Sequence, residues 1–224
     1  TANNAHINLF SLAGAPAFAV DGTINSVNIG KGTNSVAGNT VLGETALDAS
    51  VSGGNNTAIG KDALTTNTSG FQNVAVGANA LDANTTGGNC TALGMSSLSA
   101  NTTANNNTAV GYNSLNSNTT ASDNTAVGRS ALFANTTGAF NVAVGANALD
   151  ANTTASNNTG VGKSALGANT TGTRNTAVGA LALDSNTTAN DNSAFGYNAL
   201  GLNTTGANNS AFGKSSLENN STGS

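Results

Sequence analysis

The chain is poor in residues that give proteins charge, aromatic cores or cross-links. Only 7% of its 224 residues are charged and 4% are aromatic, and it has one Cys, one Pro and no Trp. Six Lys and Arg and a net charge of -4 provide no basic patch, which argues against nucleic acid as a partner. No apolar run approaches the roughly 20 residues of a membrane span. Cys90 has no second cysteine for an internal disulfide.

Catalytic and metal-binding groups are equally scarce. His6 is the only histidine, and no His/Cys or His/Asp constellation can be assembled along the chain. Asp82, Asp150 and Asp184 occur in only some of the repeats described below, unlike the dense Gly and Asp pattern of calcium-binding coils. We therefore expect no enzyme activity, no cofactor and no bound metal.

What the chain has in abundance is Asn, Thr, Ser, Ala and Gly, arranged in a strict tandem repeat. A typical unit reads N-T-A-V-G-x-x-A-L-x-x-N-T-T-G-x-x, and its glycine and leucine return with a period of 17 in eleven units. Disordered chains rarely keep apolar residues in register, so the repeat indicates an ordered structure. The columns are Gly43, Gly60, Gly77, Gly94, Gly111, Gly128, Gly145, Gly162, Gly179, Gly196 and Gly213, and Leu47, Leu64, Leu81, Leu98, Leu115, Leu132, Leu149, Leu166, Leu183, Leu200 and Leu217.

The period predicts an all-β fold, a parallel β-solenoid or β-roll of about eleven coils. It is too short for two-helix repeats or leucine-rich repeats. At ~3.3 Å per residue, one unit traces about 56 Å of extended chain, enough for two short strands and two corners. Coils stacked about 4.8 Å apart would give a rod roughly 50 Å long.

Within a unit, alternation places Val74 and Val76 on one face of a strand and Ala75 on the other. Gly77 then permits a sharp bend. A second short segment with Ala and Leu follows, and the Asn-Thr-Thr-Gly stretch forms a turn-rich corner. We expect thin layers of Ala, Val and Leu to fill the coil.

The period divides the chain into an irregular segment, residues 1–38, and a repeat array, residues 39–224. The first segment is apolar, and Val27-Asn28-Ile29-Gly30 looks like a shortened first coil. Two interpretations remain open: the segment caps the open end of the stack, or it docks onto a neighbouring subunit as an added strand. Its apolar residues are Ile7, Leu9, Phe10, Leu12, Phe18 and Val20.

The other end of the array favours docking. Phe195 and Phe212 replace Val in the last two units, and we expect a wider core there that accepts a neighbour's apolar segment. No capping segment follows the last coil, and an uncapped coil invites edge pairing. A head-to-tail contact that does not close produces a filament.

The Asn-Thr-Thr triplets allow two interpretations. Each fits the N-x-[ST] acceptor for glycosylation, but stacked asparagines also form amide ladders along cross-β structures. An inward Asn cannot carry a sugar, so geometry decides between them. Cys90 stands in a different Asn column, at the start of its unit, where it is interpreted as a small substitute rather than a reactive thiol. The triplet residues are Asn67, Asn84, Asn101, Asn118, Asn135, Asn152, Asn169, Asn186, Asn203 and Asn220.

The Asn-Thr-Ala-Val-Gly-x-x-Ala-Leu core, clearest at 124–132 and 141–149, resembles the head repeats of trimeric autotransporter adhesins and similar repeats of phage tail fibres. The resemblance covers residues 39–217, with a period of 17 in place of the family's shorter unit. It implies a left-handed parallel β-roll, packing into trimers, and adhesion to surfaces.

These patterns predict a structural subunit of an extracellular fibre or filament that assembles head to tail. A trimeric adhesin or phage tail-fibre head that binds a surface receptor or glycan is the alternative. An ice-binding solenoid is a third hypothesis, because Thr columns on a rigid rod can bind ice. That usually requires alternating outward Thr, whereas these are adjacent pairs. The expected partners are other copies of the chain, or surface glycans and receptors, at the cell surface, outside the cell or on a virion fibre.

Overall fold

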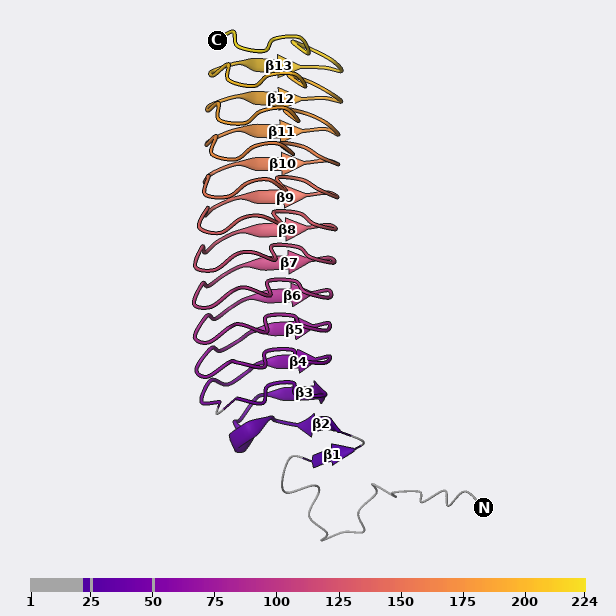
Figure 1. Cartoon of the computed structure of the whole chain (residues 1–224), viewed down its shortest axis with the longest axis vertical. Helices are drawn as coiled ribbons and strands as arrows, with labels where there is room; N and C mark the ends of the chain where they lie inside the picture. The colour runs from indigo at the N-terminus through magenta and orange to yellow at the C-terminus, as the bar shows by residue number, and fades with distance from the viewer. Residues whose placement is uncertain (1–21, 25, 50) are drawn as a thin grey trace, which may run out of the picture.

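A computed structural model describes residues 22–24, 26–49 and 51–224. Over these residues the chain is a parallel β-solenoid whose equal coils stack into a rod, with β1 (Gly22–Ile24) at one end and the C-terminus at the other (Figure 1). The predicted all-β solenoid and its period are confirmed. The proposed docking residues between Ile7 and Val20, and His6, lie outside the described residues.

Each described coil contributes one short strand to a parallel sheet that runs the length of the rod (Figure 1). Every strand residue pairs with its equivalent in the next repeat, as Ala109 pairs with Ala126. The strands keep one register because all units have the same length. They are β3 (Thr40–Gly43), β4 (Thr57–Ile59), β5 (Val74–Val76), β6 (Thr91–Leu93), β7 (Thr108–Val110), β8 (Thr125–Val127), β9 (Val142–Val144), β10 (Thr159–Val161), β11 (Thr176–Val178), β12 (Ser193–Phe195) and β13 (Ser210–Phe212).

The sheet begins with two reversals of direction rather than with a shortened coil. Strand β2 (Val27–Gly30) pairs antiparallel with β3, and β1 pairs antiparallel with β2. The interpretation of residues 27–30 as a first coil is therefore wrong. The stretch from Gly30 to Gly43 is shorter than one full coil, and the short 3-10 turn η1 (Thr33–Ser35) lies between β2 and β3.

The segment after each column glycine is a run of turns, not the expected second strand. In the unit that begins at Asn73, Asn79 and Leu81 have φ of 56° and 52°, in the left-handed region. A strand cannot pass through such residues. Asn tolerates this conformation, whereas a Leu in it costs on the order of 1–2 kcal/mol. Burial of the Leu side chain, worth about 1.5–3 kcal/mol, offsets that cost.

The regular coils have a core of Ala and Leu, and the expectation that the Val residues of the repeat fill it is wrong; among the described Val residues only Val41 and Val51, in the first coil, are buried in the core. Ala75, in the middle of β5, and Leu81 are completely buried, whereas Val74 is 39% exposed. In the regular coils the small Ala faces inward and Val faces outward; in β3 the inward position, which pairs with Ala58, is occupied by Val41. The fully buried leucines are Leu47, Leu64, Leu81, Leu98, Leu115, Leu132, Leu149, Leu166, Leu183 and Leu200.

From Gly60 to Gly196 the glycine that follows each strand is required for two separate reasons. At Gly128 φ is 133°, a conformation that L-residues rarely adopt. A Cβ at Gly128 would also lie 2.6 Å from the carbonyl oxygen of Gly145 in the next coil. At Gly213 φ is 113°, but nothing lies within 4 Å of the position of a Cβ.

This pair of glycines separates backbone strain from steric clash. Gly213→Ala should cost only the strain of its φ, of order 1–3 kcal/mol. Gly128→Ala should cost that strain and a further 1–3 kcal/mol or so, because the next coil must move. Urea denaturation followed by circular dichroism, with hydrogen exchange of the flanking coils, measures both. Equal losses in the two variants would show that coil-to-coil approach does not select this glycine.

Candidate functional site: asparagine ladders and the outer sheet face

The first Asn of each Asn-Thr-Thr triplet points into the coil and joins a ladder along the rod. Asn84 Nδ2 donates to Asn67 Oδ1 at 2.8 Å, and Asn101 Nδ2 donates to Asn84 Oδ1 at 2.9 Å. The same bond recurs from coil to coil as far as Asn203, whose Nδ2 donates to Asn186 Oδ1 at 3.2 Å. Each of these asparagines from Asn67 to Asn203 is completely buried.

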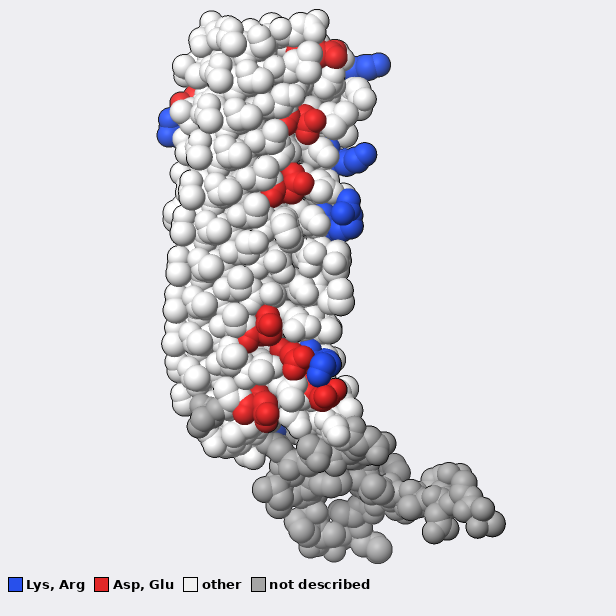
Figure 2. All heavy atoms as spheres, viewed as in Figure 1, with Lys and Arg blue, Asp and Glu red and all other residues white. Residues whose placement is uncertain are grey.

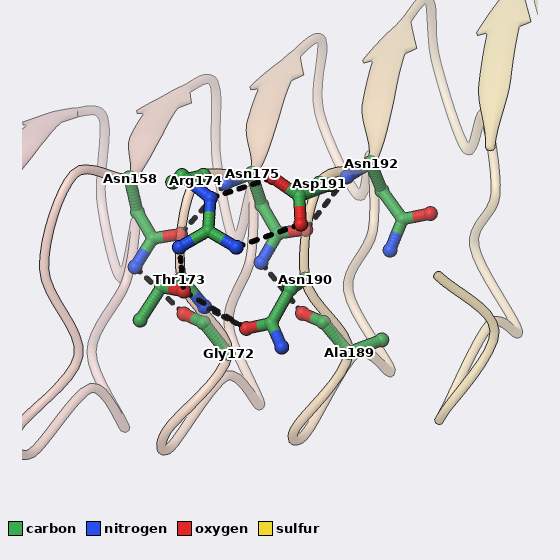
Figure 3. A network of polar contacts seen from close by, with 9 residues as sticks. All are labelled: Asn158, Gly172, Thr173, Arg174, Asn175, Ala189, Asn190, Asp191 and Asn192. Atoms are coloured by element: carbon green, nitrogen blue, oxygen red, sulfur yellow. Dashed lines mark hydrogen bonds and ion pairs between the residues drawn. The ribbon is translucent and has the colours of Figure 1, made fainter. Parts of the chain in front are cut away.

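A second ladder, which sequence reasoning did not assign, is formed by the Asn that precedes each strand. The backbone N–H of Asn175 donates to Asn158 Oδ1 at 2.9 Å, and the N–H of Asn192 donates to Asn175 Oδ1 at 3.0 Å (Figure 3). Asn175 Nδ2 reaches across the coil to the carbonyl oxygen of Ala189 at 2.8 Å. The sequence feature that could have predicted this ladder is the Asn at the start of every N-T-A-V-G motif.

The two ladders meet on one carbonyl in each coil. The carbonyl oxygen of Gly172 accepts from Asn158 Nδ2 at 2.8 Å and from Asn169 Nδ2 at 2.9 Å. Both lone pairs of that oxygen therefore accept hydrogen bonds. In the same way, most of the buried Asn side-chain amides find a partner inside the rod. An unpaired buried amide costs about 1–3 kcal/mol, so the ladders fix the position of each coil on the next.

The ladder geometry bears on the glycosylation interpretation. From Asn67 to Asn203 the amide nitrogens are buried and donate inside the coil, so a glycan on any of them is incompatible with this fold. Asn220 is only half-buried; its Nδ2 donates to Gly223 at 3.1 Å.

Cys90 interrupts the second ladder. Its backbone N–H donates to Asn73 Oδ1 at 2.9 Å, as an Asn would, but its side chain has no amide oxygen for the next coil. The backbone N–H of Asn107 therefore faces the Cys90 sulfur, a weak acceptor, whereas the equivalent N–H of Asn124 donates to Asn107 Oδ1 at 2.9 Å. Burial raises the pKa of the Cys90 thiol above its ordinary value, which keeps the thiol protonated and unreactive.

Restoring the ladder should stabilise the rod. We expect Cys90→Asn to raise the free energy of unfolding by about 1–2 kcal/mol, because the Asn107 N–H regains an amide oxygen in place of sulfur, which is a weak acceptor. Hydrogen exchange at the Asn107 amide should slow, and the urea midpoint should rise. Cys90→Ala is the matched control, which removes the sulfur without adding an amide and should give no gain. An Asn107 amide that exchanges no more slowly in Cys90→Asn than in the natural chain would contradict the proposed gap.

The two threonines of each triplet have different roles. The first donates its hydroxyl to the next coil, as Thr85 Oγ1 does to Thr102 O at 3.0 Å. The second, such as Thr86, is exposed. The corner therefore presents a single file of Thr and not the alternating outward pairs that ice binding usually requires.

Alternating outward side chains lie instead on the sheet, in two columns that we call the outer sheet face. Ala alternates with them and faces the core. The first column is Thr40, Thr57, Val74, Thr91, Thr108, Thr125, Val142, Thr159, Thr176, Ser193 and Ser210. The second column is Leu42, Ile59, Val76, Leu93, Val110, Val127, Val144, Val161, Val178, Phe195 and Phe212.

The predicted wider core at Phe195 and Phe212 is wrong, because both side chains belong to this outer face. Phe212 is 70% exposed, and its ring stacks on that of Phe195 with centroids 4.9 Å apart and 2° between the planes. The coil interior keeps Ala194 and Ala211 at the same strands, so its width does not change.

Charged groups gather on other parts of the rod. Acidic side chains lie along the middle of the face in view, and most basic ones lie along one edge (Figure 2). At the opposite corner Arg174 holds Asp191 by two bonds, Nε to Oδ1 at 2.6 Å and Nη2 to Oδ2 at 2.8 Å (Figure 3). In the described parts of the chain no three His, Cys, Asp or Glu residues are placed to bind a metal ion.

Two of the acidic residues are partly buried. Burial raises the pKa of Asp184 above its ordinary value, and the charge of Asp150 raises it further. Burial also raises the pKa of Asp82, whose Oδ1 has no hydrogen-bond partner among the described residues. Each carboxyl group therefore binds its proton more tightly in the folded chain than in the unfolded chain.

The sign of this effect predicts that mild acid stabilises the rod. Because the folded-state pKa values of Asp82 and Asp184 are raised, stability should increase as the pH falls from 7 towards the unfolded value near 3.9. The urea midpoint at pH 4.5 should exceed that at pH 7. Asp184→Asn should lessen the difference, and the exposed Asp123→Asn should not. A midpoint that falls over this range in the natural chain would contradict the assignment.

In comparisons with known proteins, no family model, curated protein or solved structure matches the chain. No helix in the described parts of the chain has the length and hydropathy of a membrane span. Interpretation of function therefore depends on the geometry of the rod and on the motif resemblance.

Proposed function

We propose that the chain is a structural subunit of an extracellular fibre or filament in which rods join end to end. The observation that carries this proposal is the axial bonding that continues from coil to coil: the strands, the triplet asparagines and the corner threonines each bind the next coil. Axial load on such a rod is shared by many hydrogen bonds in every coil. The resemblance of the repeat to adhesin heads and phage tail fibres agrees with a role outside the cell.

The two ends of the described sheet are suited to each other. Two antiparallel pairings return β1 to the direction of β3 and hence of β13. Among the described residues no strand pairs with the other edge of β13, and that edge repeats the edge by which β12 binds β13. In each coil the first strand residue donates its N–H to the next coil, as Ser193 does to Asn209 O at 2.8 Å. We expect the N–H of Ser210 to do the same for β1 of a neighbouring subunit, as a parallel added strand.

A proline at Ser210 tests this joint. Ser210→Pro removes the outward N–H but no hydrogen bond within the described chain, so each rod should fold while end-to-end fibres disappear. Ser210→Ala retains the N–H and should form fibres as the natural chain does. Negative-stain electron microscopy of the purified proteins measures the particle lengths. Natural chain seen only as separate rods of roughly 50 Å would contradict the proposal, as would fibres of unchanged length in Ser210→Pro.

A further inference from the structure

The outer sheet face is an unusual surface for a chain this polar. It runs the length of the rod, and its strands point in one direction from β3 to β13 (Figure 1). Neither of its two columns contains a charged residue. Leu93 is 46% exposed and Val144 is 37% exposed, so the aliphatic column forms a continuous apolar strip in contact with solvent. Extended apolar strips of this kind mark interaction surfaces.

The threonines of this face also retain unused hydrogen-bonding capacity. Among the described residues, the hydroxyls of Thr108, Thr125 and Thr159 have no partner, whereas the corner hydroxyl of Thr119 donates to Thr136 O at 3.3 Å. Both side-chain types on the face are mainly β-branched and therefore stiff at χ1. The face is thus a preorganised array of methyl groups and free hydroxyls.

We propose that this face binds the same face of a second copy of the chain, with the two rods lying side by side. This goes beyond end-to-end joining and does not depend on it. A second copy is favoured over other partners because its ridges have the same spacing, about 4.8 Å per coil. A partner without that repeat would lose register within a few coils. The contact is isologous, so each Thr column can meet the aliphatic or Thr column of the partner.

Charge placement supports this choice. Each chain carries a net charge of -4, yet the Asp, Glu, Lys and Arg residues that the structure describes all lie outside the two columns of the outer sheet face. Two copies can therefore approach face to face without desolvating a charge or placing like charges opposite each other, both of which are costly. Phe195 and Phe212 add a stacked aromatic pair at one end of the strip, the kind of side chain that anchors interfaces.

The size of the strip predicts how strong the contact is. Eleven strands about 4.8 Å apart and a width of about 10 Å give roughly 500 Å² on each rod, or about 1,000 Å² in total. That is the lower limit for a specific protein interface. Isolated rods should therefore associate weakly, whereas fibres that repeat the strip many times should bundle firmly through multivalency.

The test uses the full chain carrying Ser210→Pro, which prevents end-to-end joining and changes only the last residue of the first column, so lateral pairing is measured through the rest of the face. Sedimentation equilibrium of this protein should show reversible association that Val144→Lys weakens at least tenfold. Thr137→Lys, at an exposed corner site, is the matched control and should leave association unchanged. Val144→Thr keeps the shape of the side chain and should retain most of the association. Circular dichroism checks that each variant retains the solenoid.

Three results would overturn the lateral contact. One is a Ser210→Pro chain that stays monomeric up to millimolar concentration. Another is an equal loss of association in Val144→Lys and Thr137→Lys. The third is a monomer with thermal hysteresis that Val144→Lys abolishes, which would assign the face to ice instead. End-to-end fibres of single-rod width would separately retain the proposed function while removing the lateral contact.

Discussion

Each strand of the solenoid bonds the equivalent strand of the next repeat, and every other feature of the rod depends on that pairing. Because the bonds repeat without a slip from β3 to β13, equivalent residues of all coils fall into columns. Within a column, one favourable contact recurs between successive coils and forms a ladder, as the hydrogen bond from Asn84 to Asn67 does. Register also repeats one constraint from coil to coil: from Gly43 to Gly196 the column glycine must lack a Cβ, because the next coil lies directly against it.

The interior shows how a narrow coil can be stable without a large apolar core. Ala and Leu supply thin apolar layers, and two asparagines in most coils fill the remaining space with paired amides. The inward Leu is held in the left-handed region, at a cost that its burial offsets. At Cys90 the amide oxygen of this ladder is missing, and the N–H of Asn107 faces a sulfur, which is a weak acceptor.

The same narrowness determines the surface. Since Ala takes the inner face of the strand in most coils, the β-branched residues of the repeat, which favour strands, face outward. Two uncharged columns result, and they give the rod a side that differs from its charged faces and its threonine corners. Axial bonding supports the proposal of a fibre, and the outer sheet face supports the proposal that such fibres associate laterally.

The sequence by itself determined the all-β class, the coil length and the register. A 17-residue unit is long enough for one narrow coil, and units of equal length bring equivalent Gly and Leu residues into line when the coils stack. The sequence also left two roles for the triplet asparagines, which could form an amide ladder or carry glycans. Only the tertiary structure decided which side of Thr-Ala-Val faces inward, since alternation fixes two faces but not which of them is buried.

Where the sequence predicted a second strand, the structure has turns with residues in the left-handed region. The sequence could not predict this, because a residue such as Leu81 rarely adopts that conformation. The structure also showed that β2 runs against the coils, because the stretch from Gly30 to Gly43 does not complete one. The sequence thus determined the repeat, which is a local and additive property. The tertiary structure decided which side chains of each strand are buried and which are exposed, because that depends on how closely two segments of one coil approach each other.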